Sequence, residues 1–169
     1  MSQENIYCPV PRAQIPIEEF VEMSKSWFFS WPINNDSHFN RKLFISWMLV
    51  LPINLILGTG SLQLRSDIPK LLALSSLASL VFPLILLIRL WLSWQYILKR
   101  LYSEKIEYEK SGWYDGAKWD KPIEWRQRDL LIARHDVMPI IHEINQSIIV
   151  IISIIVSGLM IYYLYNKLL

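Results

Sequence analysis

The stretch INQSIIVIISIIVSGLMIYYLY, residues 144–165, contains no charged side chain and is dominated by isoleucine. An α-helix rises about 1.5 Å per residue, so about 20 such residues cross the ~30 Å hydrocarbon core of a bilayer. Because no water is present there to satisfy backbone groups, a single apolar segment crosses as a helix. Residues 144–165 therefore predict a transmembrane helix.

Two earlier stretches, 43–60 and 70–93, share this pattern and are almost free of charge. By length and composition they predict two more transmembrane helices. Pro52 and Pro83 lie inside them and should kink them, since proline has no amide hydrogen to donate. Asn54 is one turn away from the first kink, where its side chain would be able to satisfy a freed backbone group.

The polar parts of the chain are the segment 1–42 and the region 94–143. In the first, acidic residues after Pro16 predict a short helix, because a helix N-terminus favours anions. In the second, alternating residues and turn signals over 105–119 predict a hairpin. Residues 123–138 predict an amphipathic helix that Pro139 ends or bends. Its expected apolar side consists of Trp125, Leu130, Leu131 and Val137.

The fold class predicted is mainly α: a polytopic membrane protein with three transmembrane helices and a small stromal or cytoplasmic α+β region. Its orientation follows from the basic residues. Of the 17 lysines and arginines, fourteen lie in 1–42, in 94–143 or at Arg89. Cytoplasmic loops carry such an excess, and with three spans the two polar parts share a side. We therefore expect both on the cytoplasmic or stromal side.

Composition excludes several kinds of site. Cys8 is the single cysteine, which rules out an internal disulfide and a multi-thiolate metal centre. A net charge of +2 is too small to indicate a nucleic-acid partner. The centres of the spans lack acidic residues, lysine and histidine, which argues against a proton-coupled transporter. No catalytic residues and no metal ligands are predicted, and the first partner expected is the lipid bilayer.

Three residues are weak candidates for holding a cofactor. His135 and His142 are seven residues apart and would share a face of an unbroken helix. Ordinary surface or interface roles are favoured for both. Arg89 is either a ligand for a lipid phosphate or anionic cofactor, or a side chain that reaches from a helix end to water, and the second interpretation is favoured.

Tryptophan is dense outside the spans, and two interpretations are open. These rings favour the membrane interface and the core of a small domain, but tryptophan, tyrosine and arginine are also preferred anchors of protein interfaces. Residues 111–128 are expected to fold against the N-terminal segment, because apolar patches this dense are rarely left uncovered. The predicted partner-binding residues are Trp27, Trp31, Trp113, Tyr114, Trp119 and Arg128.

Two stretches resemble a known family. The first is the run 7–11 with Gln14, residues 16–17, Glu19 and the run 26–31; the second is the run 107–109 with residues 111–116, Trp119, residues 121–122 and residues 128–129. Together they are similar to the family of hypothetical chloroplast reading frame thirty-six, also called the protein conserved in the green lineage and diatoms. The resemblance covers nearly the whole chain.

The resemblance implies a membrane protein of a plastid or cyanobacterial thylakoid, with its C-terminus lumenal. It brings no established activity, ligand or cofactor. Two functions are open. The first is a non-enzymatic accessory or assembly protein of a larger photosynthetic membrane complex. The second is a pigment-, lipid- or metal-handling membrane protein, enzymatic or not, with a stromal-side pocket around Arg89, His135 and His142.

Overall fold

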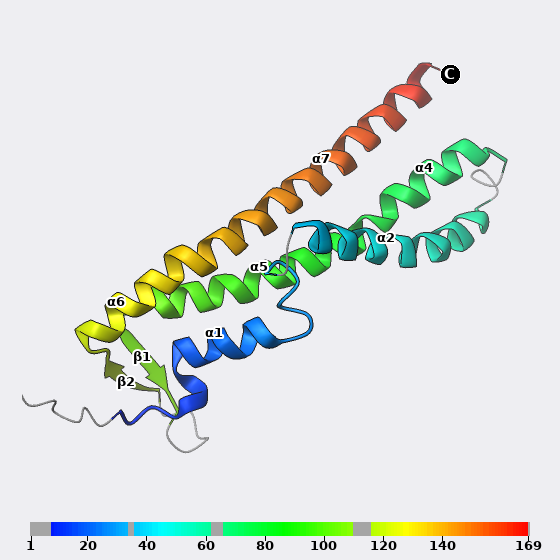
Figure 1. Ribbon diagram of the computed structural model, residues 1–169. Helices are drawn as coiled ribbons and strands as arrows, with labels where there is room; N and C mark the ends of the chain where they lie inside the picture. Colours follow the sequence, from blue (N-terminus) through cyan, green and yellow to red (C-terminus); the bar gives the residue numbers. More distant parts are fainter. Residues whose placement is uncertain (1–7, 34–35, 62–65, 110–115, 169) are drawn as a thin grey trace, which may run out of the picture. The chain divides into compact units, whose positions relative to one another are not determined.

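A computed structural model describes residues 8–33, 36–61, 66–109 and 116–168 of the chain (Figure 1). Helices account for most of these residues. The chain divides into two compact units. The polar unit comprises Met1–Ser30 and Ser93–Ile140, and the span unit comprises Trp31–Leu92 and Ile141–Leu169.

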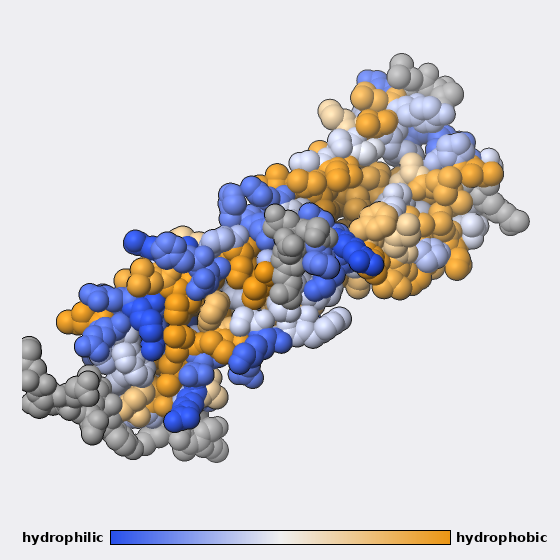
Figure 2. All heavy atoms as spheres, in the orientation of Figure 1, coloured by the Kyte–Doolittle hydropathy of each residue, from blue (hydrophilic) through white to orange (hydrophobic). Residues whose placement is uncertain are grey.

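Four helices build the span unit: α2 (Asp36–Thr59), α4 (Ile68–Ser79), the first half of α5 (Val81–Tyr102) and most of α7 (Met138–Leu168). Within the described residues, three helical stretches are long and apolar enough to cross a membrane: His38–Thr59, Ile68–Tyr102 and Ile123–Lys167. Most of their large apolar side chains are exposed, and Figure 2 shows a hydrophobic surface along α2 and α4. Apolar surface of this extent suits contact with lipid tails.

The helices α2 and α4 pack closely because small residues lie between them. A Cβ atom added to Gly58 would lie 2.7 Å from Leu71 Cδ1, so a larger residue here would displace the Leu71 side chain. Asn54 Nδ2 donates to Ser79 Oγ at 3.0 Å, and Ser75 Oγ donates to the Asn54 carbonyl at 3.2 Å. The expectation that Asn54 satisfies a backbone group beside its own kink is therefore wrong, because its side-chain amide bonds across to α4.

The second predicted span consists of two helices joined at Leu80. The Leu80 amide donates to the Leu77 carbonyl, which leaves the Ser76 carbonyl without its usual helical donor. Trp47 Nε1 of α2 donates to this carbonyl at 3.1 Å. Pro83, three residues on, has no amide hydrogen for the carbonyl one turn before it, so the break lies where a proline kink is expected.

The polar unit contains the short helix η1 (Arg12–Gln14), α1 (Pro16–Lys25), two strands and α6 (Ile123–Ile132). The strands β1 (Lys105–Tyr108) and β2 (Ala117–Asp120) pair antiparallel, with Ile106 opposite Trp119. The predicted strand pairing is confirmed; residues 110–115 between the strands lie outside the described residues. Residues 117–128 lie in the same unit as the N-terminal segment, as expected from their aromatic character.

The sequence predicts that Pro139 either ends or bends the helix that begins at residue 123. The first alternative is wrong, because the helix continues past Pro139. A π-helical segment, η2 (Ala133–Val137), links α6 directly to α7. Pro139 is the second residue of α7, and because η2 runs into α7 without a break, its missing amide hydrogen leaves a carbonyl of η2 without its helical donor. The expected apolar side also fails at Leu131, which is 59% exposed, while Asp129 is 1% exposed.

Candidate protein-binding surface

Lys121 organises the polar unit from a fully buried position. Its ammonium donates to the carbonyls of Arg100 at 2.9 Å and Leu101 at 3.2 Å, and to Asp129 Oδ2 at 2.8 Å. Three acceptors match the three hydrogens of the ammonium group, so the buried charge is compensated. The two carbonyls belong to the last turn of α5, where the helix dipole favours a cation.

The segment after Lys121 is held in place by backbone and arginine contacts. The Lys121 amide donates to the Glu104 carbonyl at 3.0 Å, and Arg126 Nε donates to the Lys121 carbonyl at 2.9 Å. Pro122 is the N-cap of α6, with an extended backbone that suits proline. Asp129, one helix turn beyond Arg126, returns to Lys121. The start of α6 is thus fastened to the end of β2 and to α5.

This arrangement brings two tryptophans and an arginine together. The rings of Trp119, on β2, and Trp125, on α6, meet edge to face with centroids 5.5 Å apart. The Arg128 guanidinium lies 5.3 Å from the Trp125 ring centroid, one turn further along α6. Both rings are half-buried, and the Arg128 side chain is 46% exposed. We call these three residues the aromatic–arginine cluster.

Arg128 is oriented from its other side by Asp129. Its Nη2 lies 3.5 Å from Asp129 Oδ1, an ion-pair distance longer than that of a strong hydrogen bond. The same carboxylate accepts from Lys121 through its other oxygen. The buried Lys121–Asp129 pair therefore lies on one side of the Arg128 guanidinium, and the Trp125 ring makes a cation–π contact on the other. Two tryptophans and an arginine in mutual contact and partly exposed have the composition of an interface anchor.

A second polar centre fastens the N-terminal segment to the same unit. Arg100 donates to Glu19 Oε1 at 2.5 Å, to the Tyr96 hydroxyl at 2.9 Å and to the Gln14 carbonyl at 2.7 Å. The Gln14 side chain donates to the Glu109 carbonyl at 3.3 Å and accepts from its amide at 2.8 Å, as a neighbouring strand would. Burial raises the pKa of Glu19, an effect that Arg100 opposes. Hydrogen bonds therefore join α1 to α5 through Glu19 and Arg100, and η1 to the end of β1 through Gln14 and Glu109.

The other predicted partner-binding residues have different surroundings. Trp31 is 8% exposed, and the Lys42 ammonium lies 5.3 Å from its ring centroid. A side chain covered within the span unit has little surface left to offer a partner. Trp27 is 79% exposed in the turn after α1. Trp113 and Tyr114 lie outside the described residues.

The three weak cofactor candidates are divided between the two units. His135 belongs to the polar unit, whereas Arg89 and His142 belong to the span unit. All three side chains are exposed, and His142 Nε2 lies 3.0 Å from Gln146 Nε2. His135 lies within the π-helical segment and His142 lies in α7, so their seven-residue spacing is not that of one regular α-helix. Among the described residues, no three histidine, cysteine or acidic side chains gather as metal ligands.

Sequence reasoning missed Trp125, Lys121 and Asp129 as site residues. The sequence pattern places Trp125 on the apolar side of a helix, and it does not distinguish Lys121 and Asp129 from other charged residues. Their spacing carries a partial signal: an acid eight residues after the lysine of a Lys-Pro pair reaches back across the first turns of a helix that begins at Ile123. The carbonyls of α5 that complete the arrangement are visible only in the tertiary structure.

Comparison with known proteins assigns the chain to a family. The profile described as CGLD27-like, conserved in the green lineage and diatoms 27, matches residues 8–150. The chain belongs to this family. The matched residues of this CGLD27-like protein include the whole aromatic–arginine cluster and the Lys121–Asp129 pair. The resemblance inferred from the two sequence stretches is therefore confirmed.

Relatives from several algae and a plant share most of the CGLD27-like chain. The uncharacterised protein ycf36 of Pyropia yezoensis is 35% identical over 98% of this chain and 99% of its own length. Its counterpart in Cyanophora paradoxa is 34% identical over 88% and 94%. The chloroplastic protein conserved in the green lineage and diatoms 27 of Arabidopsis thaliana is 28% identical over 90% of this chain and 47% of its own length. No solved structure shows a significant match.

Proposed function

We propose that this protein is a non-enzymatic accessory or assembly protein of a larger photosynthetic complex in a plastid or cyanobacterial thylakoid membrane. Three apolar helices hold it in the bilayer, and the polar unit faces the stroma or cytoplasm. The aromatic–arginine cluster binds the partner. The observation that carries this proposal is the partly exposed cluster of Trp119, Trp125 and Arg128 beside the buried Lys121–Asp129 ion pair.

Three further facts support the proposal. The helices are long and apolar enough to span, and the Arabidopsis relative is named chloroplastic. Basic residues concentrate in the polar unit, which favours the stromal or cytoplasmic side. The alternative of a pigment-, lipid- or metal-handling protein gains no specific support, because Arg89, His135 and His142 belong to different units or to separate contacts.

The test replaces Trp125 and Arg128 together by alanine in the native host. Both contribute to the cluster, yet neither is among the bonds that hold Lys121 in place. Loss of a buried aromatic anchor costs about 2 kcal/mol or more in binding, roughly thirtyfold in affinity. Gln127→Ala, at an exposed position between the two, is the matched control.

Two measurements are paired: the abundance of the protein in carbonate-washed membranes and its position on a native gel after mild detergent. We expect the double variant to stay in the membrane and to fall to the size of the free protein, while Gln127→Ala migrates with the complex. A double variant that is present at normal abundance and still migrates with a large complex excludes this surface. Arg128→Ala alone, which keeps the tryptophan pair, covers the case in which the double variant is degraded.

A further inference from the structure

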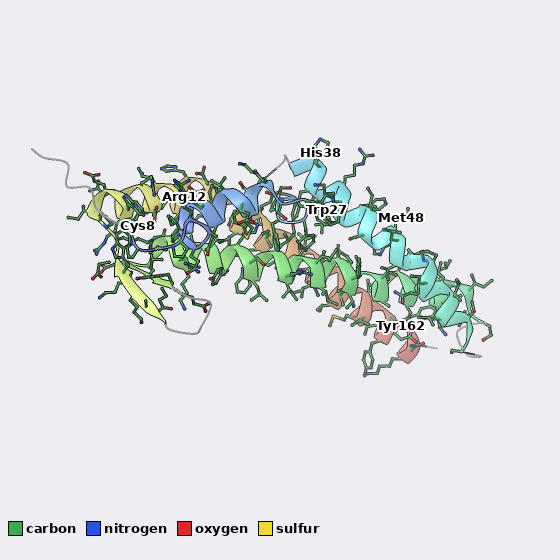
Figure 3. The ribbon with its side chains drawn as sticks, turned by 90° about the horizontal axis from the view of Figure 1, so that it is seen from below. Cys8, Arg12, Trp27, His38, Met48 and Tyr162 are labelled. Atoms are coloured by element: carbon green, nitrogen blue, oxygen red, sulfur yellow. The ribbon has the colours of Figure 1, made fainter. Side chains whose placement is uncertain are left out.

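Trp27 differs from the aromatic–arginine cluster in its degree of exposure. At 79%, it exceeds every other large apolar side chain in the described parts of the chain. Figure 3 shows it on the turn that links α1 to α2. Its ring lies 6.4 Å from that of Phe28, and Phe28 in turn contacts Phe29 edge to face at 5.2 Å. An aromatic group this exposed is expected to be covered in the working protein.

Covalent geometry places Trp27 near the entrance of the first span. Trp31 follows four residues later, and consecutive residues extend at most ~3.6 Å each, so the two α-carbons lie within about 14 Å. Trp31 packs under the Lys42 ammonium, immediately before the uncharged part of α2. The first candidate span begins at His38. This constraint depends only on the connecting chain and not on how the two units are arranged.

We propose that the turn at residues 26–30 is a lipid anchor, with the Trp27 indole in the headgroup layer on the side where α2 enters the membrane. An indole has a large apolar surface and one polar N–H, which suits the boundary between headgroups and acyl chains. Lys25 precedes the turn and Lys42 follows it, and basic residues at this level are attracted by anionic lipid. The inference rests on the proposed membrane insertion but not on the proposed partner.

Lipid is a better fit to Trp27 than a protein partner. Protein anchors are typically supported by neighbouring side chains that hold the ring in one orientation, as Trp119 and Arg128 hold Trp125. Trp27 projects from a turn and, even with the Phe28 ring beside it, is 79% exposed. A bilayer interface needs no fixed orientation, because it is fluid and accepts the ring over a range of angles. Trp27 therefore belongs to a surface separate from the cluster.

The experiment measures depth in purified full-length protein reconstituted into liposomes of phosphatidylcholine and phosphatidylglycerol. Cys8 is the single cysteine, so Cys8→Ser gives a background for single nitroxide labels. Labels replace Trp27, Leu49 and Gln127 in turn. Leu49 is 66% exposed on α2 and reports the hydrocarbon core, while Gln127 is exposed on α6 and reports the aqueous phase. Each label's collision rate is measured with oxygen, which concentrates in lipid, and with a water-soluble nickel complex.

We expect the oxygen-to-nickel ratio at position 27 to fall between the two references, at the level of the headgroup boundary. A ratio equal to that at Gln127 overturns the anchor, and so does a label shielded from both reagents, which would mean protein covers it. An aqueous reading at Leu49 would instead overturn membrane insertion itself. The liposomes contain no partner protein, so this measurement does not depend on the proposed partner. The native gel tests partner binding separately.

Discussion

At the scale of single residues, two lysines three positions apart illustrate how burial decides the value of an ion pair. Lys118 pairs with Glu107 at 2.9 Å, but both side chains are more than half exposed. Lys121 pairs with Asp129 at 2.8 Å, and both side chains are almost inaccessible to solvent. Exposed pairs contribute about 0–1 kcal/mol, whereas removing one partner of a buried pair leaves an uncompensated charge.

We predict that Lys121→Met lowers the opening free energy of the polar unit by about 3–5 kcal/mol, because Asp129 is left buried and unpaired. Lys118→Met should leave it nearly unchanged, because solvent screens the exposed pair with Glu107. Hydrogen exchange of the amides of β2 and α6 measures this locally. Lys121→Met combined with Asp129→Leu should recover part of the loss. Equal effects of the two single substitutions would contradict the role assigned to Lys121.

The sequence predicts some site residues better than others for a physical reason. Trp119 and Arg128 are of the residue types that interfaces favour, so composition alone selects them. Asp129 is of a residue type that usually faces water, since an isolated carboxylate is costly to bury. Its burial depends on Lys121, whose ammonium also donates to two carbonyls at the end of α5, 21 and 20 residues before Lys121. Such a pairing is a tertiary property and leaves no local pattern.

At the scale of elements, the apolar helices follow directly from the sequence because contact with lipid is a local property of each segment. The hairpin is also predictable, since alternation and turn residues are local. The π-helical segment was not predicted, and the break at Leu80 was predicted only as a kink at Pro83. At this break the released Ser76 carbonyl accepts from Trp47 of α2, a tertiary contact that no local pattern shows.

Close packing of α2 on α4 gives a prediction at this scale. Gly58→Leu should lower the stability of the span unit by about 1–3 kcal/mol, because the new side chain meets Leu71 and Ser75, which lies 3.2 Å from the added Cβ. Ile56→Leu, at a position 71% exposed, is the matched control. Unfolding by sodium dodecyl sulfate in mixed micelles, followed by circular dichroism, compares them. Identical midpoints would show that α2 and α4 do not pack at Gly58.

At the scale of the whole molecule, the two units differ in the surfaces that they expose. The span unit supplies apolar helices whose outer surfaces suit lipid, and the polar unit supplies the partly exposed aromatic–arginine cluster. The chloroplastic name of the Arabidopsis relative fits a plastid protein. Everything proposed about the partner depends on three membrane crossings, with the hairpin and the C-terminus on opposite sides.

Protease mapping of sealed membrane vesicles tests those crossings most directly. Lys118 is an exposed trypsin site on the hairpin, and Lys167 is exposed beside the C-terminus, where an added epitope tag reports its cleavage. With the stromal or cytoplasmic face outward, we predict cleavage after Lys118 and an intact tag; with the opposite face outward, we predict loss of the tag and protection of Lys118. Cleavage of both sites from the same face, or the reverse pattern, would contradict the account.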